Sequence, residues 1–378
     1  MIITEGLKMG KIGVNPLISL LLCSQYLLTS ASSFNSILPS GPLIVGYQNW
    51  GACDRNDTIT AVSSGVNVVI WFAINLISTD DGVAGISGGP DYDCVASVAN
   101  EIDSLGLETS HLISIGGWDA PHPDASFSGS DYAKAFNEWN LALPRPFDGF
   151  DWDLEGNDNS DSEYNLFTST TLNQMIDMSV DSKALGYIVT MVPAQSYLDV
   201  TTSEFNLSLL NNYQDYHSDF YYHGMNCYAY LIVASPQNTF DLITVQLYES
   251  WSRANQQLIN YQVPASNYLI SWWHQMTINN GWMIDFGDNS TNGLRISGKH
   301  SIIIAPSCLA VGFSRGDNQG KSAFIWPQDV GIAYEDTEVS LRPRGYAFWN
   351  IAEEGGTANG TNATLAFAPS FNEFLNIR

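Results

Sequence analysis

The segment Phe147-Asp148-Gly149-Phe150-Asp151-Trp152-Asp153-Leu154-Glu155 alternates acidic and apolar side chains over its second half. Its last three acids share one parity along the chain, while Phe150, Trp152 and Leu154 share the other. Because alternate side chains of a β-strand point to opposite faces, the pattern predicts a strand with three acids on one face. We expect its apolar face to pack against helices and its acidic face to point inward.

Short apolar or β-branched runs recur along the chain, with helix-like segments between them. The runs span residues 43–47, 66–74, 111–115, 147–154, 187–192, 242–247, 301–305 and 345–349, and three of the helix-like segments span 94–105, 131–141 and 163–183. Strands that alternate with helices favour a parallel sheet, and eight of them match a (β/α)8 barrel. We predict a single α/β domain, a (β/α)8 TIM barrel over residues 41–378, with long loop insertions at 199–240 and 250–300. An open doubly wound sheet is the alternative, but no Gly-x-Gly-x-x-Gly follows the first strand.

Three carboxylates in a row inside a barrel are unfavourable, because each charge repels the next and loses its water. A solvated edge strand would avoid this, but it would not need Phe, Trp and Leu on its other face. A calcium loop fails on spacing, since the terminal Glu position of an EF-hand counted from Asp151 falls on Ser162. The row of acids therefore indicates a functional site.

The order of the acids along the strand suggests their roles. Crowding keeps at least one carboxyl protonated near neutral pH. Glu155 lies last, at the C-terminal mouth where the active sites of barrels open, and is the expected general acid. Asp153, one step deeper, can accept a hydrogen bond and steady developing charge, and Asp151 can share a proton with Asp153.

Residues 148–155 resemble the Asp-Gly-x-Asp-x-Asp-x-Glu signature of glycoside hydrolase family 18, the chitinases and endo-β-N-acetylglucosaminidases. Upstream, Ser114-Ile115-Gly116-Gly117 resembles the Ser-x-Gly-Gly motif of the third strand in that family. The order and the separation of the two motifs also fit. In this resemblance Ser114, Gly116, Gly117 and Asp148 are structural motif residues.

The resemblance continues at the ends of later strands. Gln246-Leu247-Tyr248 is similar to the Gln-x-Tyr of plant-type class III chitinases, although Glu249 follows where Asn is often seen. Trp349 ends the eighth predicted strand, where the family keeps a tryptophan as the floor of the sugar site before the scissile bond. Tyr248 is thus a catalytic candidate, and the substrate-binding candidates are Trp349, Gln246, Met191, Gln195, Trp118 and Tyr47.

The family mechanism that this resemblance implies is retaining and substrate-assisted. Glu155 would protonate the glycosidic oxygen while the 2-acetamido carbonyl of the bound N-acetylglucosamine attacks the anomeric carbon. Asp153 would orient the acetamide N–H, Tyr248 would hydrogen-bond the acetamide oxygen, and Glu155 would then act as base to a water. Asp151 would share a proton with Asp153. No metal and no cofactor are implied.

Three functions are compatible with these residues. The first is an endo-acting chitinase that cleaves β-1,4 bonds of chitin or chito-oligosaccharides. The second is an endo-β-N-acetylglucosaminidase acting on the chitobiose core of N-glycans, and the third is a non-catalytic chitinase-like lectin or inhibitor protein. Non-catalytic relatives commonly lose the terminal Glu or a neighbouring Asp, so the three retained acids favour an enzyme, although a fold alone does not fix function.

The charge of the chain restricts its partners. The 378 residues include 14 basic and 39 acidic side chains, which give a net charge of −25. Such a surface repels nucleic acid phosphates and anionic lipids, whereas a neutral glycan is not disfavoured. We expect a monomer that binds chitin or N-acetylglucosamine oligosaccharides, with no nucleic acid partner and no membrane partner after signal removal.

The N-terminus has the charged, apolar and small-residue order of a secretory signal peptide. Lys8 and Lys11 precede an apolar run over 16–28, and small residues follow it. We predict a signal peptide over residues 1–31, cleaved near Ala31, and a secreted, extracellular protein.

An exported chain of this composition suggests disulfides and glycosylation. Removing the signal peptide leaves Cys53, Cys94, Cys227 and Cys308, and two disulfides among them allow three connectivities. We favour Cys53–Cys94 and Cys227–Cys308. Five Asn-x-Ser/Thr sequons fit a secreted glycoprotein and begin at Asn56, Asn206, Asn289, Asn359 and Asn362.

Overall fold

The computed structural model of the chain describes residues 34–157, 159, 161–209, 226–249, 252–277, 281–288, 293–315, 324–357 and 364–377. The predicted signal peptide and the sequons at Asn289, Asn359 and Asn362 lie outside these residues. Of the other sequons, Asn56 is exposed in helix α1 (Arg55–Ser63) and Asn206 is half-buried. Glycosylation of the chain stays a prediction.

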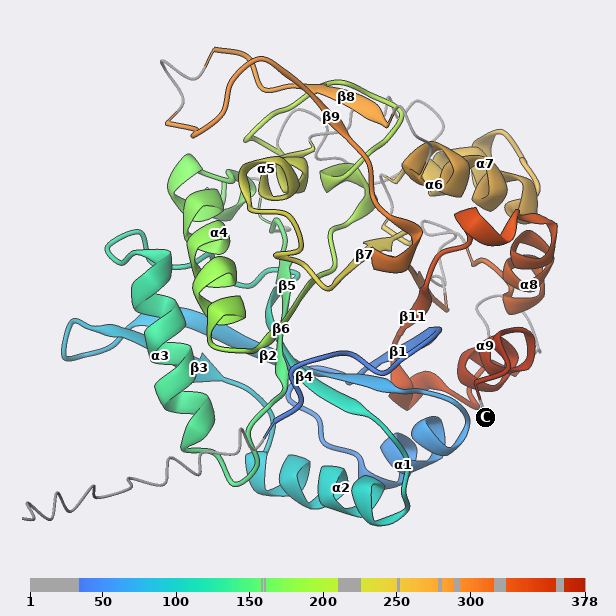
Figure 1. Cartoon of the computed structure of the whole chain (residues 1–378), viewed down its shortest axis with the longest axis horizontal. Helices are drawn as coiled ribbons and strands as arrows, with labels where there is room; N and C mark the ends of the chain where they lie inside the picture. The colour runs from blue at the N-terminus through green and yellow to red at the C-terminus, as the bar shows by residue number, and fades with distance from the viewer. Residues whose placement is uncertain are drawn as a thin grey trace, which may run out of the picture. The chain divides into compact units, whose positions relative to one another are not determined.

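Eight parallel strands close into a barrel (Figure 1). They are β1 (Leu43–Tyr47), β2 (Val68–Ser78), β4 (Ser110–Gly117), β5 (Gly149–Leu154), β6 (Ile188–Met191), β7 (Leu242–Gln246), β10 (Leu309–Ser314) and β11 (Gly345–Trp349). Each pairs with its neighbours in the order β1-β11-β10-β7-β6-β5-β4-β2, and a β1–β2 pairing closes the ring. The predicted (β/α)8 fold is confirmed.

Helices lie outside the strands, and two short antiparallel pairings are added to the barrel (Figure 1). The other helices are α2 (Tyr92–Ser104), α3 (Gly129–Leu141), α4 (Ser169–Ala184), α5 (Cys227–Ala234), α6 (Arg253–Asn255), α7 (Ala265–Thr277), α8 (Pro327–Asp336) and α9 (Phe367–Leu375). Strand β3 (Ala84–Gly88) pairs with the end of β2, and β8 (Trp282–Asp285) pairs with β9 (Lys299–Ile302). Within the part of the chain that the structure describes, no helix is both long and apolar enough to cross a membrane.

The predicted segment 163–183 divides into two pieces at a pair of helix caps. Ser162 caps a short turn, η1 (Glu163–Asn165), by accepting a hydrogen bond from the Tyr164 N–H. Thr168 then caps α4 through the Thr171 N–H. Hydroxyl groups at these positions satisfy N–H groups that a helix start leaves unpaired, so the true helix begins later than predicted.

The prediction that residues 301–305 form the seventh strand of the barrel is wrong. Residues 301 and 302 belong to β9, which pairs with β8 outside the barrel, and Ile303 is 46% exposed. The barrel strand is β10, which pairs with β7 and β11 and is buried at every position. The physical reason is that β-branched residues suit any pleated pairing, including a hairpin, and cannot by themselves report closure into a barrel.

Two apolar layers surround the strands. An inner cluster fills the barrel with alternate side chains such as Leu43, Val68 and Leu112. An outer cluster between strands and helices contains the apolar face of β5, Phe150, Trp152 and Leu154, as the alternation predicted. The inward positions of β5 carry Asp151 and Asp153, which lie level with Ser114, Gly116 and Thr190 of the neighbouring strands.

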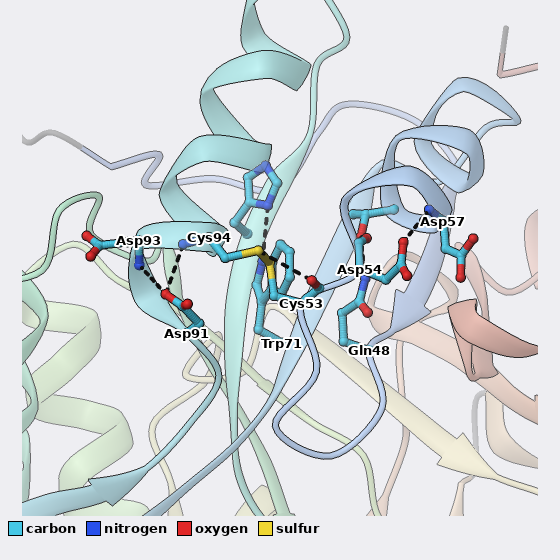
Figure 2. The surroundings of a disulfide bond; sticks show 10 residues. Gln48, Cys53, Asp54, Asp57, Trp71, Asp91, Asp93 and Cys94 are labelled. Carbon is cyan, nitrogen blue, oxygen red and sulfur yellow. Dashed lines mark hydrogen bonds between the residues drawn. A yellow bond between two sulfur atoms is a disulfide. The ribbon is translucent and has the colours of Figure 1, made fainter.

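A disulfide joins Cys53 to Cys94, with an S–S distance of 2.07 Å (Figure 2). Asp54 and Asp91 cap the helices α1 and α2 beside it, so the bond ties two helix N-termini together (Figure 2). The first predicted pairing is therefore confirmed. The second is wrong, because Cys227 and Cys308 are both free thiols and Cys227 is buried in α5. A chain with four cysteines does not have to pair them all.

Candidate active site

The deepest acid of β5 is held by two hydroxyl groups. The Asp151 Oδ2 accepts a hydrogen bond from the Tyr47 OH at 2.9 Å, and its Oδ1 accepts one from the Thr190 Oγ1 at 2.5 Å. In the sheet register, Asp151 lies between Ser114 of β4 and Thr190 of β6. Burial raises the pKa of Asp151 to about 7, against the effect of the two hydroxyl donors.

Asp153 and Glu155 meet at the side chain of Gln246, which comes from the end of β7. The Gln246 Nε2 lies 2.9 Å from the Asp153 Oδ1 and 3.3 Å from the Glu155 Oε1, and it also donates to the Val192 carbonyl at 2.8 Å. An amide NH2 has two hydrogens for these three acceptors, so the contact with Glu155 is shared and weak. The side chains of Gln246 and Asp153 thus both contact the Glu155 carboxyl.

The two outer acids are protonated more readily than ordinary carboxyls. Burial, followed by the charges of Glu155 and Asp151, raises the pKa of Asp153 well above its usual value. Burial also raises the pKa of Glu155 to about 7, and a hydrogen bond links the two carboxyls. Because neighbouring carboxylates repel, the pair titrates together and holds a proton near neutral pH. Such a group can donate a proton to an oxygen at the mouth of the barrel.

Tyr248 and an aromatic wall complete the lining of this end of the barrel. Burial and the negative charges of Asp153 and Glu155 raise the pKa of Tyr248, so its hydroxyl stays neutral. Trp349, at the end of β11, packs against Phe72 with ring centroids 4.8 Å apart and against Tyr47 at 6.2 Å. Trp50 continues this wall into solvent: it is 48% exposed, and its ring centroid lies 4.4 Å from that of Phe72.

The paired glycines that end β4 make room for this arrangement. Gly116 and Gly117 have φ values of +102° and +110°, a region that side chains disfavour. A Cβ on Gly116 would lie 2.9 Å from the Asp153 carbonyl oxygen, and one on Gly117 would lie 2.5 Å from the Trp50 ring. The two glycines thus leave room next to Asp153 and Trp50, and the role of the motif stays a prediction. Ser114, from the same motif, is fully buried beside Asp151.

Two of the predicted substrate-binding residues, Met191 and Gln195, do not line the site. Met191 is fully buried in the outer cluster with Trp152, because the neighbouring Thr190 takes the inward position on β6. Gln195 is also fully buried, and its amide binds the Tyr268 OH at 2.7 Å and the Ala254 N–H at 2.8 Å. Both predictions are corrected to packing and loop anchoring. Trp118 is half-buried directly after the glycine pair.

Four residues at this end of the barrel were not predicted from the sequence. Glu249 is half-buried, with its two carboxyl oxygens 2.6 Å from the Ser196 N and 3.0 Å from the Ser196 Oγ, and desolvation raises the pKa of Glu249 to about 8. The departure from Asn at this position was the available signal. Thr190 gave a weaker signal, through its parity in a strand next to the acids. Trp50 and Phe72 gave no signal in the sequence. Phe72 on β2 reaches Trp349 on β11 only because the barrel closes with β1 between these two strands.

Among the described residues, no group of three or more His, Cys, Asp or Glu side chains is arranged to hold a metal ion. The acids of β5 accept hydrogen bonds from hydroxyl and amide groups.

Comparison with known proteins identifies the fold. No protein-family model and no curated protein matches the chain. A family 18 chitinase from Chromobacterium violaceum matches with a TM-score of 0.58 and 15% identity over 90% of this chain and 85% of that one. A family 18 chitinase from Pseudoalteromonas aurantia matches with a TM-score of 0.54 and 14% identity over 88% and 99%. The chain thus has the (β/α)8 fold of these two solved structures.

Proposed function

We propose that this chain is a secreted family 18 glycoside hydrolase that cleaves β-1,4 bonds in chitin or chito-oligosaccharides. The observation that carries the proposal is the meeting of Asp153, Glu155 and Gln246 at the C-terminal end of the barrel, with Tyr248 beside them. The fold alone would also suit a non-catalytic relative, but a binding protein has no need for carboxyls with raised pKa values at the mouth.

Glu155 acts as the general acid and base in this proposal. With its pKa raised to about 7, a substantial fraction of Glu155 is protonated near neutral pH and can protonate the glycosidic oxygen. As the leaving group departs, the bond between the anomeric carbon and that oxygen breaks, and the substrate acetamide oxygen forms the new bond. Glu155 then takes a proton from water, which opens the cyclic intermediate with net retention of configuration.

The neighbouring residues bind and orient the acetamide group. Asp153 accepts its N–H and offsets the positive charge that develops on it, while Tyr248 donates its neutral hydroxyl to the acetamide oxygen. Asp151, held by Tyr47 and Thr190, lies deeper, and its charge contributes to the raised pKa of Asp153. Trp349 and Tyr47 offer apolar ring faces below the sugar, and Trp50 offers an exposed one farther out.

The protein requires no bound metal in this scheme, since the substrate itself supplies the nucleophile. The net charge of −25 does not repel a neutral glycan. A buried cluster of acids also excludes anionic sugars from the innermost site, which is consistent with uncharged N-acetylglucosamine as the substrate unit.

A product assay tests the proposal directly. Purified chain is incubated with chitin oligomers and, separately, with a high-mannose glycopeptide, and the Glu155→Gln variant serves as the matched control. We expect cleavage of the chitin oligomers by the wild type alone. Cleavage restricted to the glycopeptide would replace the substrate with an N-glycan core, and binding of oligomers without cleavage would replace the enzyme with a lectin.

A further inference from the structure

The main chain around Glu155 is held by three side chains that take no part in the proposed chemistry. Strand β5 ends at Leu154, so the sheet no longer fixes the peptide groups that follow. The Tyr228 OH donates to the Leu154 carbonyl at 3.0 Å. The His122 Nε2 lies 2.9 Å from the Glu155 carbonyl, and the Tyr197 OH accepts the Gly156 N–H at 3.1 Å.

These three contacts come from three different parts of the chain. His122 lies in the loop after β4, Tyr197 ends the short helix η2 (Gln195–Tyr197) after β6, and Tyr228 lies in the first turn of α5. A carbonyl oxygen only accepts hydrogen bonds, so His122 must carry its proton on Nε2. Burial lowers the pKa of His122 to about 4, which keeps the ring neutral in this donor form.

The rings of the three residues are packed around one phenylalanine. The Phe167 ring centroid lies 4.6 Å from His122, 5.6 Å from Tyr197 and 6.1 Å from Tyr228. Tyr197 and Tyr228 stack on each other and are 1% and 0% exposed. Buried rings in mutual contact have little rotamer freedom, so their polar tips are fixed before any substrate binds.

A further contact links Tyr197 to the loop that follows β7. Glu249 directly follows Tyr248 and holds the N–H and the hydroxyl of Ser196, the residue before Tyr197. A displacement of Tyr197 would therefore also disturb the end of β7. The contacts thus join the loop that carries Glu155 to the loop that carries Tyr248.

From these contacts we infer that His122, Tyr197 and Tyr228 are positioning residues that hold the Glu155 main chain, so that its carboxyl stays within reach of Gln246 and of the scissile oxygen. This inference rests on the proposed function for its kinetic consequence. Its structural content, the fixed placement of Glu155, is independent of the substrate. Because a displacement of about 1 Å can lower a rate by up to about 10²-fold, three main-chain contacts are sufficient to matter.

The test uses variants that keep the rings and remove the polar tips. Tyr197→Phe and Tyr228→Phe each delete one contact, and His122→Leu deletes the third while His122→Gln retains a donor. Tyr230→Phe is the matched control, since Tyr230 is a fully buried tyrosine of the same helix whose hydroxyl binds Asn173 at 2.8 Å, away from the acids. Each variant by itself tests one contact. If one variant fails to fold, the remaining variants still test the inference.

Two readouts separate the inference from the proposed function. On a chito-oligosaccharide, we expect each contact variant to lower kcat about 10-fold with KM within about twofold, and His122→Gln to recover most of the loss. Titration of the Glu155 carboxyl by NMR, assigned with Glu155→Gln, should show its pKa lowered by about 1 unit in the contact variants, because a loosened carboxyl gains water. Tyr230→Phe should match the wild type in both.

The outcomes are distinct. If the contact variants match Tyr230→Phe in kcat and in the titration, the inference is overturned. If the wild type cleaves no glycan, the proposed function fails, yet the titration still decides whether these residues position Glu155.

Discussion

Two acids, Asp148 and Glu155, flank strand β5 and differ in their hydrogen-bond partners. Asp148 precedes the strand at the closed end of the barrel, and its carboxylate accepts main-chain N–H groups from Asn35 at 2.6 Å and His111 at 2.8 Å. Glu155 follows the strand at the open end, where its carboxyl contacts the Gln246 amide at 3.3 Å and shares a hydrogen bond with the Asp153 carboxyl. Both are raised in pKa by burial, so burial alone does not distinguish them.

The difference lies in which donors each carboxylate is given. Main-chain N–H groups favour the charged form and fix the side chain as part of the fold. A buried carboxyl that is paired with another carboxyl keeps a proton more readily and remains able to exchange it with another molecule. The hydrogen-bond partners of a buried acid thus distinguish a structural carboxyl from a reactive one.

Replacement of Glu155 should have the largest effect. In Glu155→Gln the group loses its exchangeable proton while the side chain keeps its size, so we expect kcat on chito-oligosaccharides to fall by about 10²–10⁴-fold, with binding retained. Steady-state kinetics and calorimetric titration measure the two effects. The exposed Glu163→Gln in η1 is the control, and turnover of Glu155→Gln at the wild-type rate would remove Glu155 from its role.

Replacement of Asp153 should follow. Asp153→Asn retains one acceptor but loses the charge next to the substrate acetamide, so we expect kcat to fall by about 10²-fold. The same kinetic assay measures it, with circular dichroism to verify the fold. An unchanged rate would show that Asp153 serves the fold as Asp148 does.

Replacement of Asp148 should affect stability and not chemistry. In Asp148→Asn an amide NH2 group faces a buried N–H donor, and leaving that donor unsatisfied should lower the free energy of unfolding by about 1–3 kcal/mol. Urea unfolding measures this loss, with Asp81→Asn in the exposed turn between β2 and β3 as the control. The kcat of the folded variant should equal that of the wild type, and a selective loss of kcat would contradict the structural role.

The smallest effect should be on the pH dependence of stability. The pKa of Glu155 is about 7 in the fold against an ordinary value of 4.5, so between these pH values the folded chain holds a proton that the unfolded chain releases. The stabilisation from this proton is complete below about pH 4.5 and is lost as pH rises through about 7. We expect the Tm of Glu155→Gln to exceed that of the wild type by about 2 °C at pH 8 and to match it near pH 4.

Thermal scans of both proteins across this pH range measure the effect. Identical curves at every pH would mean that Glu155 is as well satisfied as Asp148, and the contrast between the two acids would then be lost.

Local patterns in the sequence predicted those parts of the fold that local physics determines. Strands β1 and β11 have the expected bounds, and the alternation along β5 correctly divided its acids from its outer apolar face. The pairing of Cys53 with Cys94 also followed. The proposed roles of the acids stay predictions until they are tested.

Predictions that depended on which other segment a residue contacts were less accurate. Residues 301–305 had the composition of a strand, but pairing with β8 decided their place. Met191 had the correct strand and the wrong parity, and Cys227 lies buried in a helix without a disulfide partner. The errors at residues 301–305 and at Cys227 concern contacts between segments far apart in the chain, which composition and spacing do not encode. The error at Met191 concerns the side-chain alternation of its own strand.

The sequence by itself determined the barrel class and the row of acids, because side-chain alternation and strand–helix succession are properties of neighbouring residues. Only the tertiary structure decided how those acids are satisfied. It brought Gln246, Tyr47 and Thr190 onto the carboxyls, and it brought His122, Tyr197 and Tyr228 onto the main chain of Glu155. The physical reason is that a hydrogen bond depends on the placement of two groups, and here closure of the barrel makes that placement.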